Sequence, residues 1–293
     1  MHVVFGASGA LGSRVVARLL AAGEPVRAVS RAPGRIAGQC ESGAEGVTAD
    51  LRDPESLPPA LAGARSLVLA AHGLVPPSRG NHPGEVDGPG ARAAIDAAVQ
   101  AGVRRIIHLS VPGAHGDATA FGRVKRATER HLEASGVPFT ILRPTLFMEN
   151  HALVLLGEPL RRGAKVDFFG AGTTPLNWVS ADDVAGWVAD AALDPDRPSE
   201  TLEVGGPEVM TRRDALGVLE IVLGREARRR HLPLPVVQGV RWTVGVVHPG
   251  VRFLLDLVLA EERGRLGPPP TPSELDRSGM TQLEELASTW AQA

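Results

Sequence analysis

Gly6, Gly9 and Gly12 have the spacing of a turn that cradles phosphate groups. They follow the apolar residues 3–5 and precede a helical pattern at residues 15–20. A strand that ends in such a turn and leads into a helix points free backbone N–H groups, and the positive end of the helix dipole, at one anion. Gly6 allows the tight turn, Gly9 lets the backbone approach a pyrophosphate, and Gly12 lets the helix pack on the strand. The pattern favours dinucleotide binding over an ordinary turn.

The end of the second expected strand, residues 25–30, should meet the adenosine ribose. An acidic residue at this point would bind the 2′-hydroxyl of NAD, but the strand ends in Ser30 and Arg31, with Arg35 four residues further on. A guanidinium group is well suited to a 2′-phosphate. The alternative is that Arg31 is a solvated surface arginine. The sequence therefore favours NADP(H).

Lys125 is the most informative side chain of the helix expected at about residues 118–135. Phe121, Lys125, Thr128 and Leu132 occur at i, i+4, i+7 and i+11, so they share one helix face. A lysine in an apolar stripe either extends its ammonium group to water along its own stem or points at the ribose and nicotinamide of a cofactor. Both interpretations remain open at this stage.

Short β-rich runs alternate with helical patterns through the first half of the chain, which predicts βαβ units and a parallel sheet. The expected strands are residues 3–5, 26–30, 46–48, 66–70, 105–109 and 138–142. The Pro- and Gly-rich residues 71–89 form a long loop on the ligand-facing edge. A helix is expected from Pro89 onward.

The last third of the chain is less regular. Helical patterns cover residues 212–223, 236–247 and 251–262, and residues 165–169 resemble part of a hairpin. The basic residues 225–230 favour a solvated helix end. Ser180-x-x-Asp183 and Thr281-x-x-Glu284 have the pattern of helix capping boxes.

Length and composition exclude several classes of protein. The 293 residues suit one elaborated domain or two unequal lobes, and the net charge of −2 does not favour nucleic-acid binding. Cys40 is the single cysteine, which excludes an intramolecular disulfide and a cysteine-based metal cluster, so we expect no metal. No secretory leader is visible, and residues 232–260 carry too many polar groups for a membrane span. We therefore expect a cytoplasmic location.

Further motifs follow one another in a known order. They are GASGALG at 6–12, Arg31, DLRDPESL at 50–57, IDAA at 95–98, GVRR at 102–105, Lys125 before Glu129, GVPFTILRP at 136–144, FMEN at 147–150 and DVA at 183–185. Over about residues 1–210 the chain resembles NmrA-like members of the atypical short-chain dehydrogenase/reductase superfamily.

The resemblance implies an α/β fold, with a doubly wound parallel Rossmann sheet and a smaller, mainly helical C-terminal lobe that holds the substrate. The NADP-binding domain would comprise residues 1–150, completed by about 173–210, and the substrate lobe residues 151–172 and 211–293.

The resemblance also assigns residues to NADP(H). Contacts to the phosphates fall to Gly6, Ser8, Gly9, Ala10, Leu11 and Gly12. Arg31 would bind the 2′-phosphate, Asp50 and Leu51 the adenine, and Ala70, Ala71 and His72 would lie along the ribose. Lys125 would hold the nicotinamide ribose, Ser110 would lie near the nicotinamide, and Pro144, Thr145, Leu146 and Phe147 would form the wall behind its ring.

One departure from the related reductases limits the chemistry. Their Tyr-x-x-x-Lys motif reads Phe121 to Lys125 here, and the chain contains no tyrosine. Loss of a positioned general acid typically costs ~10²–10⁴ in rate, and it matters most when hydride transfer leaves a basic alkoxide. The reduced oxyanion of a quinone or conjugated acceptor is delocalised, so water or a histidine can protonate it. His115 and His151 are candidates, although either could be an ordinary surface or core histidine.

The sequence thus predicts an NADPH-dependent reductase of a small apolar quinone, enone or related conjugated acceptor, with Lys125, Ser110 and His115 at the catalytic site. The alternatives are a non-catalytic NADP(H)-sensing regulatory protein and a biosynthetic tailoring enzyme of the same fold. The expected partner is a small apolar substrate, with no nucleic acid and no membrane, and a homodimer is left open.

Overall fold

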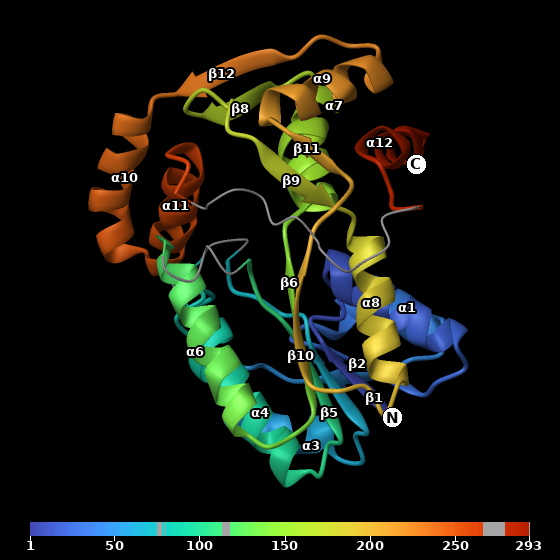
Figure 1. The fold of residues 1–293 in the computed structure, drawn as a ribbon. Coiled ribbons are helices and arrows are strands. Elements are labelled where there is room, and N and C mark those ends of the chain that lie inside the picture. The colour runs from blue at the N-terminus through green and yellow to red at the C-terminus, as the bar shows by residue number, and fades with distance from the viewer. Residues whose placement is uncertain (75–77, 79, 113–117, 266–278, 293) are drawn as a thin grey trace.

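A seven-stranded, wholly parallel sheet forms the centre of the larger lobe in the computed structural model, which describes residues 1–74, 78, 80–112, 118–265 and 279–292 (Figure 1). The strand order is β10-β6-β5-β4-β1-β2-β3. The strands are β1 (His2–Phe5), β2 (Val26–Ser30), β3 (Glu45–Thr48), β4 (Ser66–Leu69), β5 (Arg105–Leu109), β6 (Phe139–Pro144) and β10 (Glu200–Val204). The order reverses between β1 and β4, so the carboxyl ends of these two strands flank the expected ligand crevice. The predicted doubly wound α/β class is confirmed.

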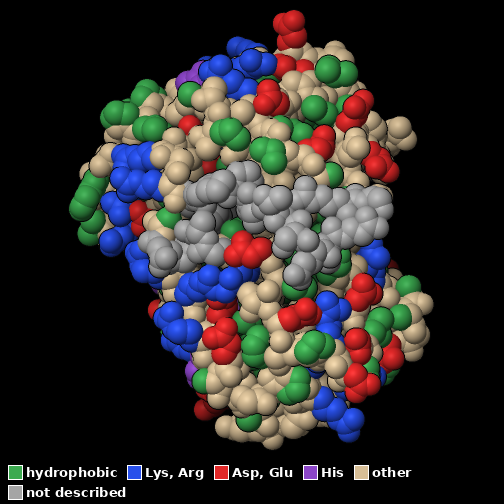
Figure 2. All heavy atoms as spheres, viewed as in Figure 1, with side chains coloured by type: hydrophobic (Ala, Val, Ile, Leu, Met, Phe, Trp, Pro, Cys, Tyr) green, Lys and Arg blue, Asp and Glu red, His purple; other side chains and the backbone are tan. Residues whose placement is uncertain are grey.

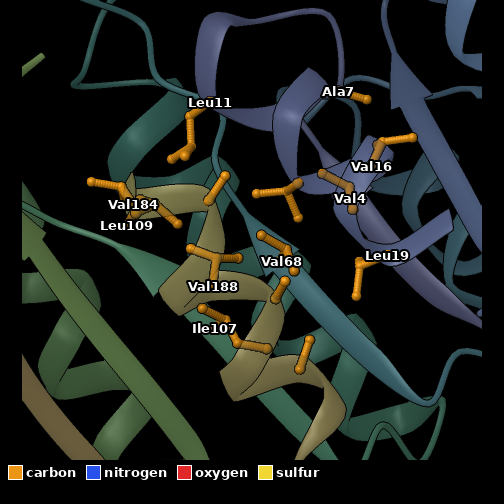
Figure 3. Packing of buried hydrophobic residues seen from close by; sticks show 14 of the residues in the cluster. Val4, Ala7, Leu11, Val16, Leu19, Val68, Ile107, Leu109, Val184 and Val188 are labelled. Carbon is orange, nitrogen blue, oxygen red and sulfur yellow. The ribbon is translucent and has the colours of Figure 1, made fainter. Parts of the chain in front are cut away.

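Helices cover both faces of the sheet, which is why the central strands β1 and β4 are fully buried, whereas the edge strands β3 and β10 carry exposed polar residues. On one face, α1 (Ala10–Ala21) and α8 (Ala181–Leu193) pack on strand residues such as Val4 and Val68 (Figure 3). The other face is covered by α3 (Leu57–Leu61), α4 (Ala91–Gln100) and α6 (Ala120–Ala134). Short helical segments η1 (Pro33–Ile36), α2 (Ala37–Glu41) and η2 (Pro54–Ser56) lie at the sheet edge.

The smaller lobe lies beyond the carboxyl ends of the sheet strands (Figure 1). Its strands are β7 (Leu146–Phe147), β9 (Leu176–Val179) and β11 (Glu208–Met210), which form one sheet, and β8 (Lys165–Phe169) and β12 (Arg228–Leu232), which form another. Its helices are η4 (Glu149–Gly157), α7 (Glu158–Arg161), α9 (Arg212–Leu223), α10 (Leu234–Val247), α11 (Pro249–Glu262) and α12 (Leu283–Gln292). Trp178 and Phe168 are fully buried at its centre. Among the described residues, connections between the lobes run from β6 to β7, from β9 to α8 and from β10 to β11.

Two predictions for this lobe are wrong because a long-range strand pairing decides the local structure. β8 forms no hairpin, since its partner is β12 and the two strands run parallel. Most of the basic segment is not a helix end: α9 ends at Leu223 and is capped by Gly224, whose φ of +58° is left-handed, and residues 228–230 belong to β12. Arg230 and Asp167 form an ion pair of 2.6 Å across these two strands.

The two expected capping boxes are also incomplete, because Thr281 of the second box binds Asp183 of the first. Ser180 caps α8 by accepting a hydrogen bond from the backbone of Asp182. Asp183, however, accepts hydrogen bonds of 3.1 Å from the backbone N–H and the hydroxyl of Thr281. The C-terminal segment is therefore attached to α8. None of the helices in the described ranges has the length and hydropathy needed to cross a membrane.

Candidate cofactor and active site

The turn after β1 has a geometry that only glycine fits. Gly6 has φ of +85°, and a Cβ there would lie 2.7 Å from the backbone nitrogen of Ala71. A Cβ on Gly12 would lie 2.2 Å from the carbonyl oxygen of Gly6. A side chain at position 6 would push the turn away from the end of β4, and a side chain at position 12 would push α1 away from the turn. The close approach of these three segments brings the start of α1 directly to the crevice between β1 and β4.

The start of α1 is open to an anion. Gly9 precedes the helix and supplies no side-chain cap, and the first turn contains no acidic residue. Ser8 and Ala10 are partly exposed and Gly9 is exposed, whereas Leu11 is buried beneath them. Free N–H groups and the helix dipole therefore point at solvent in a glycine-lined turn, as a pyrophosphate requires. The residues present fit the phosphates of a dinucleotide.

Two guanidinium groups lie at the expected adenosine end. Arg31 donates a 2.7 Å hydrogen bond to the side chain of Asn81, which lies in the loop after β4. Arg52 binds the Asp50 carboxylate through its Nε, at 3.0 Å from Oδ1, and this hydrogen bond holds the pKa of Asp50 below its usual value. Since Arg52 compensates Asp50, Arg31 adds positive charge, which suits a 2′-phosphate. Leu51 is buried, and the sequence patterns gave Arg52 no role.

His72 follows Ala70 and Ala71 at the end of β4, beside the Gly6 turn. Its ring is open to solvent, yet the protein around it desolvates the imidazole and lowers its pKa. Its Nδ1 accepts a 3.2 Å hydrogen bond from the backbone of Leu74, so the neutral ring carries its proton on Nε2.

Lys125 is not a snorkelling lysine. Its side chain is only 5% exposed, and its ammonium group lies 2.7 Å from Oδ1 of Asp87, whose side chain is fully buried. The ammonium also donates a 2.8 Å hydrogen bond to the carbonyl of Leu109, at the end of β5. The ring centre of Phe121 lies 5.7 Å away on the same helix face, as the periodicity predicts. The charge of Lys125 is thus fixed inside the protein at the carboxyl end of the sheet.

Asp87 is the residue that the sequence patterns missed. It lies in η3 (Val86–Gly90), a π-helical turn that precedes α4. Its other carboxylate oxygen accepts a 2.8 Å hydrogen bond from the backbone of Gly73, and its carbonyl accepts one of 2.7 Å from the Thr128 hydroxyl. The same residue therefore connects α6, η3 and the loop after β4. The only local signal was an acidic residue just before the expected helix start at Pro89.

Ser110 is buried one residue beyond β5. Glu129 lies on the helical turn of α6 after Lys125, and burial raises the pKa of its carboxyl, an effect that the neighbouring Ser110 side chain opposes. Arg143 holds the same carboxyl with two hydrogen bonds, of 2.9 and 2.8 Å. The buried hydroxyl of Ser110 has no hydrogen-bond partner among the described residues, and a direct role at the nicotinamide stays a prediction.

The expected wall residues lie where the chain crosses to the smaller lobe. Pro144 ends β6 and is buried, and Leu146 and Phe147 form β7, which pairs with β9. The hydroxyl of Thr145 donates a 2.8 Å hydrogen bond to Asn177 of β9. These contacts fix the segment between the two lobes, opposite the end of β5.

Burial lowers the pKa of the two described histidines near the expected crevice, His72 and His151. His151, in η4, has its pKa lowered to about 3 by burial and by the nearby charge of Arg212, with a smaller effect of His72. At neutral pH its ring is therefore uncharged, and a role of His151 in protonating the product stays a prediction. His115 lies outside the described residues.

Comparison with known proteins agrees with this geometry. The family model described as NAD(P)H-binding matches residues 6–195. A (4-alkanoyl-5-oxo-2,5-dihydrofuran-3-yl)methyl phosphate reductase of Streptomyces griseus is 35% identical over 234 residues, covering 79% of this chain and 77% of the reductase. An NAD(P)H azoreductase of Xenophilus azovorans is 28% identical, covering 78% and 76% of the two chains.

Solved structures share the whole fold. The NADPH complex of a quinone oxidoreductase from Escherichia coli superposes with a TM-score of 0.75 at 24% identity, covering 99% of both chains. A Citrobacter triphenylmethane reductase with NADP(H) gives the same TM-score at 21% identity and the same coverage. The glycine turn, the open start of α1 and the matched family model lead to one conclusion: this chain belongs to the NAD(P)H-binding family and has the fold of NADPH-dependent reductases.

Proposed function

We propose that this protein is an NADPH-dependent reductase of a small apolar acceptor whose reducible bond is conjugated, such as a quinone or an enone. When bound, the cofactor supplies the hydride. The glycine turn and Arg31 bind its phosphates, and Lys125, held by Asp87, binds the nicotinamide ribose. The pair of buried charges presents a fixed donor at the end of β5, which orients the ring toward the smaller lobe.

The observation that carries the proposal is the lack of a charged or phenolic proton donor around Lys125 in the described part of the chain. Phe121 occupies the tyrosine position with a ring only 6% exposed, and His151 and His72 are both biased to the neutral form. A reaction that leaves an alkoxide needs such a donor, at a cost of ~10²–10⁴ in rate when it is missing. A conjugated acceptor spreads the negative charge, and water then completes the reaction by supplying the proton.

The similar proteins act on acceptors of this kind, as their names state. The Streptomyces reductase takes an alkanoyl oxo-dihydrofuran, and the others take an azo compound, a quinone and a triphenylmethane compound. What they share is an unsaturated, electron-poor system rather than an isolated ketone. This supports the class of acceptor and leaves the individual molecule to experiment.

The test is NADPH consumption with matched acceptors. Cyclohexenone and cyclohexanone differ by one double bond, and benzoquinone provides the quinone arm. We expect turnover with the quinone or the enone and at least a hundredfold lower kcat/KM with the saturated ketone. Faster reduction of cyclohexanone would overturn the proposed reaction class. Tight NADPH binding with no turnover on a broad panel would favour the alternative, a non-catalytic NADP(H)-binding protein.

A further inference from the structure

Asn81, in the loop after β4, contacts the arginine at the expected adenosine end of the cofactor. Its amide oxygen accepts a 2.7 Å hydrogen bond from Nη1 of Arg31. Asn81 is only 8% exposed, whereas Arg31 is exposed. A nearly buried amide is costly unless it is hydrogen bonded, and the guanidinium supplies such a bond. The contact therefore joins the loop after β4 to the end of β2.

The turn that carries Asn81 is fixed by its own contacts. The backbone N–H of Asn81 donates a 2.9 Å hydrogen bond to the hydroxyl of Ser78, and its carbonyl accepts one of 3.3 Å from the Ser78 backbone. Arg52, which is held by the Asp50 carboxylate, donates a 2.6 Å hydrogen bond to the carbonyl of Gly80. Asn81 thus presents its amide oxygen from a fixed position.

The backbone on either side of Arg31 is fixed as well. The hydroxyl of Ser30, at the end of β2, donates a 3.1 Å hydrogen bond to the carbonyl of Ala32 and accepts one of 3.2 Å from its N–H. Arg31 lies between these two residues, so its backbone is held by Ser30 and the tip of its side chain by Asn81. An arginine that is already ordered avoids an entropy cost of about two- to tenfold in affinity when it binds an anion.

The partner of Arg31 is electrically neutral. An amide oxygen fixes the direction of the guanidinium without cancelling its charge, and the bond uses one of five N–H donors. A carboxylate in the same place would cancel the charge and repel a phosphate. No broad positive field replaces this contact, because the net charge is −2 and side chains of both signs are interspersed over the larger lobe, in the lower part of Figure 2. Selection of the additional phosphate of NADPH therefore depends on local contacts.

We propose that Asn81 is a positioning residue that sets the preference for NADPH over NADH. It directs the guanidinium of Arg31 at the 2′-phosphate and leaves the positive charge intact. The proposal rests on the proposed function, in which Arg31 binds this phosphate, and it makes residue 81 a second determinant of cofactor choice. A residue that only anchored the loop would affect both dinucleotides alike, since NADH differs from NADPH in lacking this phosphate.

Titration of the full chain with NADPH and with NADH, in the absence of an acceptor, tests the proposal through the ratio of the two Kd values. Asn81→Asp keeps the size of the side chain and makes the partner of Arg31 anionic. It should raise the Kd for NADPH about ten- to hundredfold and leave the Kd for NADH within about threefold. Asn81→Ala releases the guanidinium but keeps its charge, so the Kd for NADPH should rise about two- to tenfold.

The control is Gln100→Glu, the same change from amide to carboxylate on an exposed residue. Gln100 ends α4, at the amino end of the sheet and away from the crevice, so neither Kd should change. A double-variant cycle shows whether Asn81 acts through Arg31. In an Arg31→Ala background, Asn81→Ala should have no further effect on the Kd for NADPH, because no guanidinium remains to be oriented.

Two results would overturn the proposal alone: a Kd ratio that Asn81→Asp leaves unchanged, or an equal loss of both dinucleotides in Asn81→Ala, which would identify a loop anchor. Equal affinities in the unmodified protein would overturn the role of Arg31 and this proposal together. Because no acceptor is present in the titration, failure to reduce quinones and enones would refute the proposed reductase activity without altering the Kd ratio.

Discussion

The buried pair of Lys125 and Asp87 makes the sharpest prediction about this fold. Lys125→Met keeps most of the apolar stem and removes the ammonium group. The Asp87 carboxylate, fully buried, would keep only its hydrogen bond from Gly73. Removal of one partner from a buried ion pair costs about 3–5 kcal/mol, because the other charge is left without compensation. We expect Lys125→Met and Asp87→Asn each to lower the free energy of unfolding by about this amount.

The double variant identifies the cause. With both charges removed, the free energy of unfolding should fall by much less than the sum of the two single losses. The difference is the coupling energy of the pair, which we expect to be about 0.5–3 kcal/mol or more. Urea unfolding measures all four proteins, and an unchanged m value shows that the transition is the same. Lys165→Met, on the exposed edge of β8, is the control and should change stability by less than about 0.5 kcal/mol. The pairing would be refuted if each single substitution lowered the free energy of unfolding by less than about 1 kcal/mol and the two losses simply added in the double variant.

Three further substitutions test the site. Gly12→Ala places a Cβ 2.2 Å from the Gly6 carbonyl and should weaken NADPH binding at least about tenfold, whereas Gly217→Ala, in open space on α9, should not. Arg31→Ala should remove a preference for NADPH over NADH of about ten- to hundredfold, as measured by titration with both cofactors, and equal affinities in the unmodified protein would contradict this. His151 binds its proton in the unfolded chain near pH 6.5 and in the folded chain only near pH 3, so its contribution to stability is lost as pH falls through that window. The free energy of unfolding should therefore fall by up to about 1.4 kcal/mol per pH unit on acidification, and His151→Gln should flatten this slope. If denaturation at several pH values gave the same slope for the variant and the unmodified protein, the result would count against the buried neutral ring.

Local patterns were sufficient where one segment determines its own structure. The glycine turn, the first six strands of the sheet and the face of α6 with Phe121 and Lys125 all follow from spacing between near neighbours, whereas the edge strand β10 was not predicted. The helix at residues 212–223 is found at its predicted bounds. These features depend on hydrogen bonds and side-chain periodicity within one element, which the sequence displays directly.

Long-range pairing explains the rest. Nothing near Lys125 in the sequence indicates Asp87, because the π-helical turn has no simple periodicity and the contact joins different elements. The parallel pairing of β8 and β12 overrides the helical propensity of the arginine-rich segment, since β12 gains a ladder of backbone hydrogen bonds. Thr281 binds Asp183 rather than capping its own helix for the same reason: the better partner is distant in sequence.

The multiple connections between the lobes in the described part of the chain restrict how the protein can open. A single connection would let the smaller lobe swing as a hinged lid, but the described connections from β6, β9 and β10, together with the contact of Thr281 with Asp183 of α8, remove most rotational freedom. Shear, in which packed elements slide by small amounts, is the motion that such a joint permits. An acceptor must then enter through side-chain movement, and the distance between donor and acceptor is set when the protein folds rather than when the substrate binds. Such a protein gains precision in hydride transfer at the expense of the range of substrate sizes it admits.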